Sequence, residues 1–151
     1  MSRVAARAAV MQMIFEKISG GHGGEETLRM VYDELREDGI PGVEKISENE
    51  PNPSDRAYIN KVMQGVLDNL EIIDQKIENA AKGWTLERMS LVDLTIMRLA
   101  AWEILYEDDV PGNVAISEAL GLTAYYSDPD DKSFINGILG TILRDHEAQQ
   151  K

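Results

Sequence analysis

Apolar side chains recur along most of the chain at three- and four-residue intervals, and the interruptions between these runs predict about seven helices. An alanine-rich stretch predicts the first helix from about Arg3 to Ser19, where two glycines end it. A second apolar run predicts another helix that ends near Gly39. The segment 40–53 contains three prolines and a glycine, which indicates a long loop.

Beyond this loop, a single apolar face continues to about Lys82, which predicts one long helix capped by Ser54. Gly83 closes this helix, and residues 85–89 are expected to form a short turn.

The next helix is predicted to be the centre of the fold. Ser90 is followed three residues later by Asp93, which is a capping-box arrangement. The residues that follow, 94–105, are apolar on nearly every side of a helix. Such a helix is normally buried among other helices.

Two further helices complete the pattern, one from Pro111 to about Tyr126 and one that carries residues 134–143 into a polar tail. The segment 127–131 between them is expected to be a turn. No segment alternates apolar and polar residues as a half-buried strand does, so the predicted fold class is all-α.

The amino-acid composition excludes several kinds of functional site. The 151 residues include no cysteine, which excludes disulfides, thiolate zinc sites, iron–sulfur clusters and a cysteine nucleophile. The first ten residues lack the long apolar core of a signal peptide, and no apolar run approaches the ~18 residues of a membrane span. We therefore expect a cytoplasmic protein.

The sequence contains no evident catalytic motif. The two histidines, His22 and His146, lack a second ligand at metal-binding spacing, and neither a phosphate-binding glycine loop nor a nucleophile elbow is present. The acidic run 128–131 lacks the alternating oxygen ligands and the closing glutamate of a calcium loop. We expect no enzymatic activity, metal or cofactor.

Charge is distributed unevenly around a formal net value of −12. Residues 1–17 carry Arg3, Arg7 and Lys17 against Glu16, a net charge of +2, whereas residues 84–131 carry two arginines against ten acids, a net charge of −8. The total argues against unspecific nucleic-acid binding, which relies on neutralising phosphates, and favours a basic partner or simple solubility.

Several motifs, in order and at matching spacing, resemble the NusB family of transcription antitermination factors. The residues similar to its core signature are Trp84, Arg88, the segment 94–105, and then 109–111, 114–116, Glu118 and Ala119. The segment 134–139 resembles its second signature, and Ser2, Arg3, Arg7, Gln12 and Phe15 resemble its arginine-rich opening helix. Asp55 and Tyr58 match more weakly.

The resemblance implies a single NusB-like domain over residues 1–151, folded as two angled helical bundles, 1–83 and 84–151, around the buried central helix. It also implies a function. Members of this family bind the single-stranded boxA element of leader RNA together with the ribosomal protein NusE, within the transcription elongation complex and during ribosomal RNA synthesis.

The resemblance also implies which residues contact RNA. They are Arg3, Arg7, Phe15, Lys132 and Phe134. Basic side chains that hold phosphates and aromatic rings that stack on unpaired bases are the usual means of binding single-stranded RNA. Each phenylalanine has a core position as its alternative. The chain departs from the family where Val4 and Ser133 stand in place of basic residues.

The later helices hold NusE in the family, so Arg98, Glu103 and Glu118 are the expected partner-binding residues. Arg98 and Glu103 have a structural alternative, because charges on a mostly buried helix need partners. Gly137, inside the last helix, is expected to permit a close helix crossing.

Two other classes of protein compete with the RNA-binding interpretation. One is a helical adaptor that binds a protein but has weak or no RNA binding, consistent with the net charge of −12. The other is a fragment of a ribosomal RNA-modifying enzyme, because the same helical domain precedes a methyltransferase domain in some such enzymes. The sequence up to Lys151 contains no glycine-rich nucleotide-binding segment, so no catalytic domain is expected.

Overall fold

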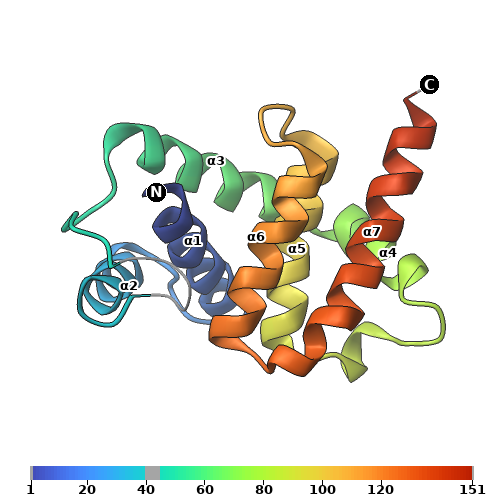
Figure 1. Cartoon of the computed structure of the whole chain (residues 1–151), viewed down its shortest axis with the longest axis horizontal. Helices are drawn as coiled ribbons and strands as arrows, with labels where there is room; N and C mark the ends of the chain where they lie inside the picture. Colours follow the sequence, from blue (N-terminus) through green and yellow to red (C-terminus); the bar gives the residue numbers. More distant parts are fainter. Residues whose placement is uncertain (1, 40–44, 151) are drawn as a thin grey trace. The chain divides into compact units, whose positions relative to one another are not determined.

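The computed structural model describes residues 2–39 and 45–150, and over these residues the chain is helical without any strand (Figure 1). The α-helices are α1 (Ser2–Ile18), α2 (Glu25–Glu37), α3 (Pro53–Asp68), α4 (Leu70–Ala80), α5 (Leu91–Tyr106), α6 (Gly112–Tyr126) and α7 (Lys132–Gln149), with 3-10 turns η1 (Leu86–Arg88) and η2 (Pro129–Asp131). This confirms the predicted all-α class. None of the helices in the described ranges combines the length and apolarity that crossing a membrane requires.

The chain forms two compact units, Met1–Gly65 and Val66–Lys151. The division falls inside α3, whereas the family resemblance implied a division near residue 83. As a result α4 and η1 belong to the second unit. The angle between the two predicted bundles stays a prediction.

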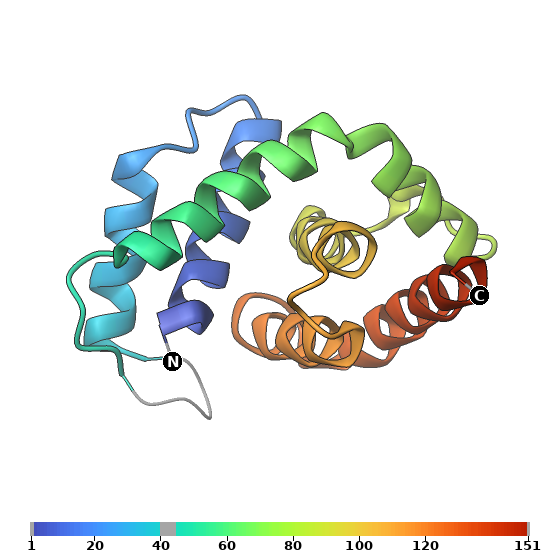
Figure 2. The same ribbon diagram turned by 90° about the horizontal axis from the view of Figure 1, so that it is seen from above.

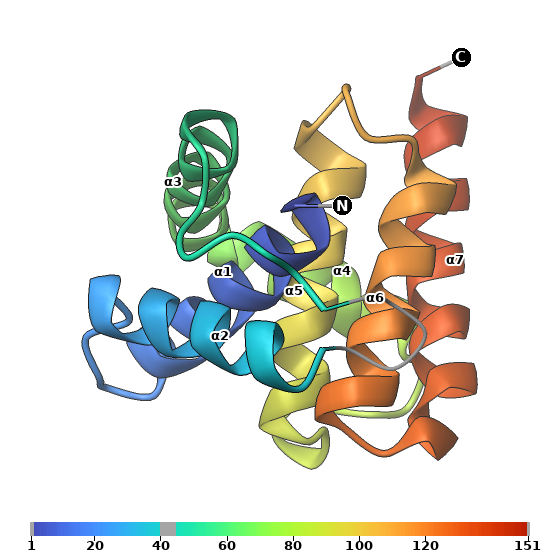
Figure 3. The same ribbon diagram turned by 60° about the vertical axis from the view of Figure 1, so that its left-hand side comes forward.

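In the first unit, α1 and α2 lie side by side (Figure 3). The four alanines of α1, Ala5, Ala6, Ala8 and Ala9, are fully buried, and their small side chains permit close packing. The turn between the helices needs glycine at Gly23, where φ is +59° and a Cβ atom would overlap the carbonyl oxygen of Met13.

The predicted single helix from Ser54 to Lys82 is wrong, because the structure divides it at Asn69 into α3 and α4. The buried face of α3 includes Tyr58 in the first unit, and α4 buries Ile77 in the second. Asparagine is a poor helix former whose side chain competes for backbone hydrogen bonds, which favours a break at this position.

The predicted cap at Ser54 is also wrong. The Asn52 side chain is the cap, since its Oδ1 accepts the Asp55 N–H at 2.8 Å. Pro53 opens α3, where its fixed φ fits and its missing N–H costs nothing, so the helix starts one residue before Ser54.

In the second unit, α5 is the central helix, as predicted. Every residue from Asp93 to Ile104 is buried, and α4, α6 and α7 all pack against the helix, which Figure 2 views nearly end-on in yellow. The Ser90 Oγ accepts the Asp93 N–H at 3.0 Å, which confirms the predicted cap.

The packing role expected for Gly137 is wrong. This glycine is exposed, and no atom outside its own helix backbone lies within 4 Å of the position that a Cβ would take. The close approach in this unit occurs instead at Gly112, where a Cβ would overlap the Leu143 side chain. Helical spacing alone did not distinguish an exposed glycine from a packed one.

Candidate functional site

The arginines of α1 meet the first turns of α3. The Arg3 Nε donates a hydrogen bond to the buried Asp55 Oδ1 at 3.1 Å, and a second, longer contact of 3.4 Å joins its Nη2 to Ser54 Oγ. The Arg3 guanidinium also lies 4.4 Å from the centroid of the Tyr58 ring, and that of Arg7 lies 5.7 Å from it. These contacts bring both guanidinium groups to the Tyr58 ring.

The two arginines differ in exposure, and this decides how each can act. The Arg3 side chain is 38% exposed, so it can reach a ligand while it remains hydrogen-bonded to Asp55. Arg7 is only 5% exposed and lies within the core of the unit. Phe15, the aromatic residue expected on this helix, is half-buried.

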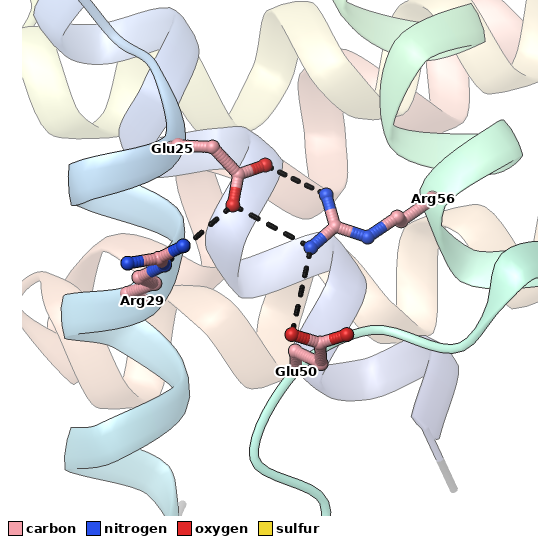
Figure 4. A network of polar contacts seen from close by, with 4 residues as sticks. All are labelled: Glu25, Arg29, Glu50 and Arg56. Carbon is pink, nitrogen blue, oxygen red and sulfur yellow. Dashed lines mark hydrogen bonds and ion pairs between the residues drawn. The ribbon is translucent and has the colours of Figure 1, made fainter.

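A second charged network of this unit joins α2, α3 and the loop before α3 (Figure 4). The Arg56 guanidinium donates to the Glu25 carboxylate at 2.6 Å and lies 4.0 Å from Glu50, while Arg29 approaches Glu25 at 3.8 Å. The hydrogen bond from Arg56 lowers the pKa of Glu25. Glu25 and Glu50 thus neutralise two basic side chains that would otherwise attract an anion.

In the second unit, an aromatic pair lines a pocket of about 310 Å³. The Trp84 and Phe134 rings meet edge to face, with centroids 5.7 Å apart and planes at 65°. The Arg88 guanidinium lies 5.8 Å from the Trp84 centroid. The full lining consists of Trp84, Arg88, Met89, Ser90, Asp93, Asp131 and Phe134.

Local structure places these side chains together. Trp84 precedes η1 and Arg88 ends it, Asp93 lies in the first turn of α5, and Asp131 ends η2. Lys132 and Phe134 occupy the first turn of α7, where Lys132 is exposed and Phe134 half-buried. The starts of two helices therefore meet at this pocket.

Two carboxyl groups form the polar wall of the pocket. The pKa of Asp131 is raised to about 6. The main cause is a hydrogen bond to Asp93, and burial and the charge of Asp93 raise the pKa further. The Ser127 hydroxyl donates to Asp93 Oδ1 at 2.6 Å, which fixes that carboxylate. Below about pH 6 the Asp131 carboxyl is mostly protonated, and at higher pH it is mostly ionised.

The three residues expected to bind a partner lie at different depths. Arg98 is buried and makes a bidentate contact with Asp74 of α4, at 2.7 Å from Nε and 2.8 Å from Nη2. Glu103 is 1% exposed, whereas Glu118 on α6 is half-buried. The contact of Arg98 supports its structural alternative.

Sequence reasoning assigned no role to most of the pocket. Trp84 and Arg88 carried the family resemblance, and Asp93 was explained as a helix-capping residue. Asp131 lies in the segment 127–131, which was expected to be a turn. Trp84 and Arg88, four residues apart, were the signal available in the sequence, but the two carboxyl groups come together only when distant segments of the chain pack.

In the described residues the protein is all-helical and has two clusters of basic and aromatic side chains, one of Arg3, Arg7 and Tyr58 and one of Trp84, Arg88 and Phe134. A family model described as the NusB family matches residues 4–144. The transcription antitermination protein NusB of Clostridium botulinum (strain Kyoto / Type A2) is 34% identical over 143 residues, which cover 95% of this chain and 100% of that protein. The chain belongs to the NusB family.

Solved structures agree with this assignment. NusB of T. maritima has a TM-score of 0.73 at 26% identity, covering 98% of this chain and 94% of that one. A chain from a complex of the antitermination factors NusB and NusE with double-stranded RNA has a TM-score of 0.73 at 21% identity, over 95% of this chain and 97% of that one. At that identity the second likeness concerns the fold alone.

Proposed function

We propose that this protein is a transcription antitermination factor that binds boxA-type leader RNA together with the ribosomal protein NusE, within the transcription elongation complex. The observation that carries the proposal is the cluster at the start of α7, where the exposed Lys132 adjoins the aromatic pair of Phe134 and Trp84. Cationic and aromatic side chains at one place suit unpaired RNA. Membership of the NusB family supports it, as does the likeness in fold to a chain solved with NusE and RNA.

We assign different roles to the five residues that are expected to bind RNA. Arg3 and Lys132 contact phosphates, because both are accessible. Phe134 contacts a base. Arg7, which is 5% exposed, supports the Tyr58 ring beside Arg3, and Phe15 contributes the exposed part of its ring. These residues act without catalysis, and the relatives' role in transcription supports a cytoplasmic location.

We propose that NusE binds to the acidic second unit. Glu118 on α6 is the most accessible of the three expected partner-binding residues, so it is placed in direct contact with basic side chains of NusE. Arg98 and Glu103 are buried, so we assign them a supporting role rather than direct contact with the partner.

The test is the salt dependence of RNA affinity. Each phosphate contact to a single strand contributes about 0.7 to the slope of log K against log salt. Arg3→Ala and Lys132→Ala should each lower that slope by about this amount. Arg29→Ala is the control. The Arg29 side chain is 72% exposed, but it belongs neither to the cluster around Arg3 nor to the one around Phe134. Unchanged slopes in both test variants would contradict the phosphate contacts.

A second candidate function is a protein-binding adaptor with little RNA affinity of its own. The observation that favours it is the engagement of Arg3 and Arg7 by Asp55 and Tyr58, which leaves less positive charge for phosphates. Titration of boxA-type RNA in the presence and absence of NusE separates the two. An adaptor would bind NusE with the same affinity whether or not RNA is present.

A further inference from the structure

Asp55 is fixed in the first turn of α3, beside the guanidinium group of Arg3. Its backbone N–H donates to the Asn52 side chain at 2.8 Å, and its own side chain is only 3% exposed. One carboxylate oxygen, Oδ1, accepts the Arg3 Nε–H at 3.1 Å. A buried carboxylate on a capped helical turn can therefore restrict the orientation of a longer and more exposed side chain.

The contacts of Arg3 occupy one edge and one face of its guanidinium group. Nε donates to Asp55, and Nη2 makes the longer contact of 3.4 Å with Ser54 Oγ. The Tyr58 ring, which belongs to a residue only 4% exposed, has its centroid 4.4 Å from the guanidinium carbon. Nη1 takes part in neither hydrogen bond, and the Arg3 side chain is 38% exposed. The outer edge, formed by Nη1 and the second N–H of Nη2, therefore remains for a ligand.

This outer edge of Arg3 suits a phosphate. Two parallel N–H groups of an arginine match two phosphate oxygens, and such a bidentate contact depends on how the planar group is oriented. A side chain that is already ordered also loses less conformational entropy when it binds. Asp55 is thus placed to strengthen binding by Arg3, although its negative charge alone would weaken the attraction to an anion.

We propose that Asp55 is a positioning residue for RNA binding, which orients Arg3 so that the outer edge of the guanidinium receives an RNA phosphate. Asp55 is buried, so it acts through Arg3 and does not touch RNA itself. Tyr58 restricts the plane of the same guanidinium group. This inference rests on the proposed function, which it deepens by naming the residue that prepares Arg3 for a phosphate.

A double-mutant cycle of Asp55 and Arg3 tests the positioning role. Affinity for a single-stranded boxA-type RNA oligonucleotide is measured by fluorescence anisotropy at about 0.15 M salt, where exposed charges are partly screened. Asp55→Ala should weaken binding by about 2–13-fold, the range for ordering one long side chain. Charge alone predicts the opposite sign, because the variant has one negative charge fewer. In the Arg3→Ala background, Asp55→Ala should cause no further loss.

Two further variants separate positioning from folding and from net charge. Asp55→Asn keeps an oxygen that can accept the Arg3 Nε–H, so it should weaken binding less than Asp55→Ala does. If thermal unfolding shows that Asp55→Ala is not folded, the same cycle is measured with Asp55→Asn. Asp33→Ala is the charge control, because it removes a carboxylate that is 63% exposed from the same unit, and it should not weaken binding.

The salt dependence of binding gives a second readout. Asp55→Ala keeps the positive charge of Arg3, so the slope of log K against log salt should stay close to that of the parent protein. Arg3→Ala removes the charge itself and should lower the slope by about 0.7. A lower affinity with an unchanged slope is therefore the signature of a lost orientation.

The positioning role would be overturned if Asp55→Ala bound RNA as tightly as the parent protein. An equal loss in the presence and absence of Arg3 would overturn it too, since Asp55 would then act through the fold and not through Arg3. Both results leave the proposed function standing. If the parent protein itself does not bind boxA-type RNA, the proposed function and the positioning role are both wrong.

Discussion

At the residue scale, the Asp131 carboxyl is placed where a second carboxyl opposes its ionisation. The hydrogen bond to Asp93 and the neighbouring charges raise its pKa from 3.8 to about 6. A folded-state pKa above the unfolded value means that the folded protein binds the proton more tightly between these two pH values. The free energy of unfolding contributed by Asp131 therefore falls as pH rises from about 4 to 6 and is constant outside that window.

Asp131→Asn should remove this dependence. The variant should be more stable than the parent protein above about pH 6, and the difference should shrink as pH falls towards 4. Thermal unfolding of both proteins across this pH range measures the effect, and Asp130→Asn serves as the control on the same turn. A stability difference that does not change with pH would contradict a raised pKa of Asp131.

The Arg98–Asp74 contact is a different kind of charged pair, because its members are largely shielded from water. The side chain of Arg98 is 8% exposed and that of Asp74 is 21% exposed. Removal of one member from a buried pair leaves an uncompensated charge, which costs more than the intact pair contributes. Loss of either member is therefore expected to destabilise the packing of α4 against α5.

Asp74→Ala should lower the free energy of unfolding by about 2–4 kcal/mol, somewhat less than the full cost for a deeply buried pair because Asp74 is partly exposed. The exposed pair of Arg36 and Asp33 provides the control, and Asp33→Ala should cost less than about 1 kcal/mol. Denaturant titration gives both values. Similar small losses at the two sites would mean that Asp74 is not needed to compensate Arg98.

At the scale of elements, α5 is stabilised by burial on every side rather than by a single apolar face. Its residues Asp93 to Ile104 are all buried, and three helices of its unit pack around it. In contrast, α2 buries one face that includes Leu28, Val31 and Leu35, and exposes the opposite one. A change in α5 therefore affects more of the core than a similar change in α2.

Leu99→Ala in α5 should cost about 2–5 kcal/mol of unfolding free energy, because Leu99 is 1% exposed and truncation leaves a cavity. Leu91→Ala at the start of the same helix is the matched control, since Leu91 is 40% exposed, and it should cost far less. The two variants share the chemical change and differ in burial. A loss below half a kilocalorie for Leu99→Ala, measured by denaturant titration, would contradict a central position for α5.

At the scale of the whole molecule, the net charge of −12 opposes the approach of RNA. The residues 84–131, with a net charge of −8, attract a basic protein. A basic partner bound there adds positive charge and offsets part of the repulsion. The charge of the chain thus favours binding of RNA and partner together over binding of RNA alone.

NusE is accordingly expected to raise the affinity for boxA-type RNA by about 5–150-fold, the usual span of a coupling free energy of ~1–3 kcal/mol. Linkage requires that RNA raise the affinity for NusE by the same factor. Titration of each ligand with and without the other measures both factors. Equal affinities under both conditions would contradict cooperative binding and favour the adaptor.

The sequence by itself determined the helical class and the extent of most helices, although not of α3 and α4, because helix periodicity and capping depend on residues a few positions apart. The Ser90 cap, the buried α5 and the order of the later helices were all predicted and confirmed. Family membership was also indicated by motif spacing alone.

Only the tertiary structure decided which helices divide and which distant side chains meet. The break at Asn69 interrupts an apolar periodicity that continues past it in the sequence, and the exposure of Gly137 depends on what packs against α7. The pairing of Arg98 with Asp74 and of Asp93 with Asp131 joins residues that are far apart in sequence. Such contacts are set by how whole elements pack, and local propensity carries no information about them.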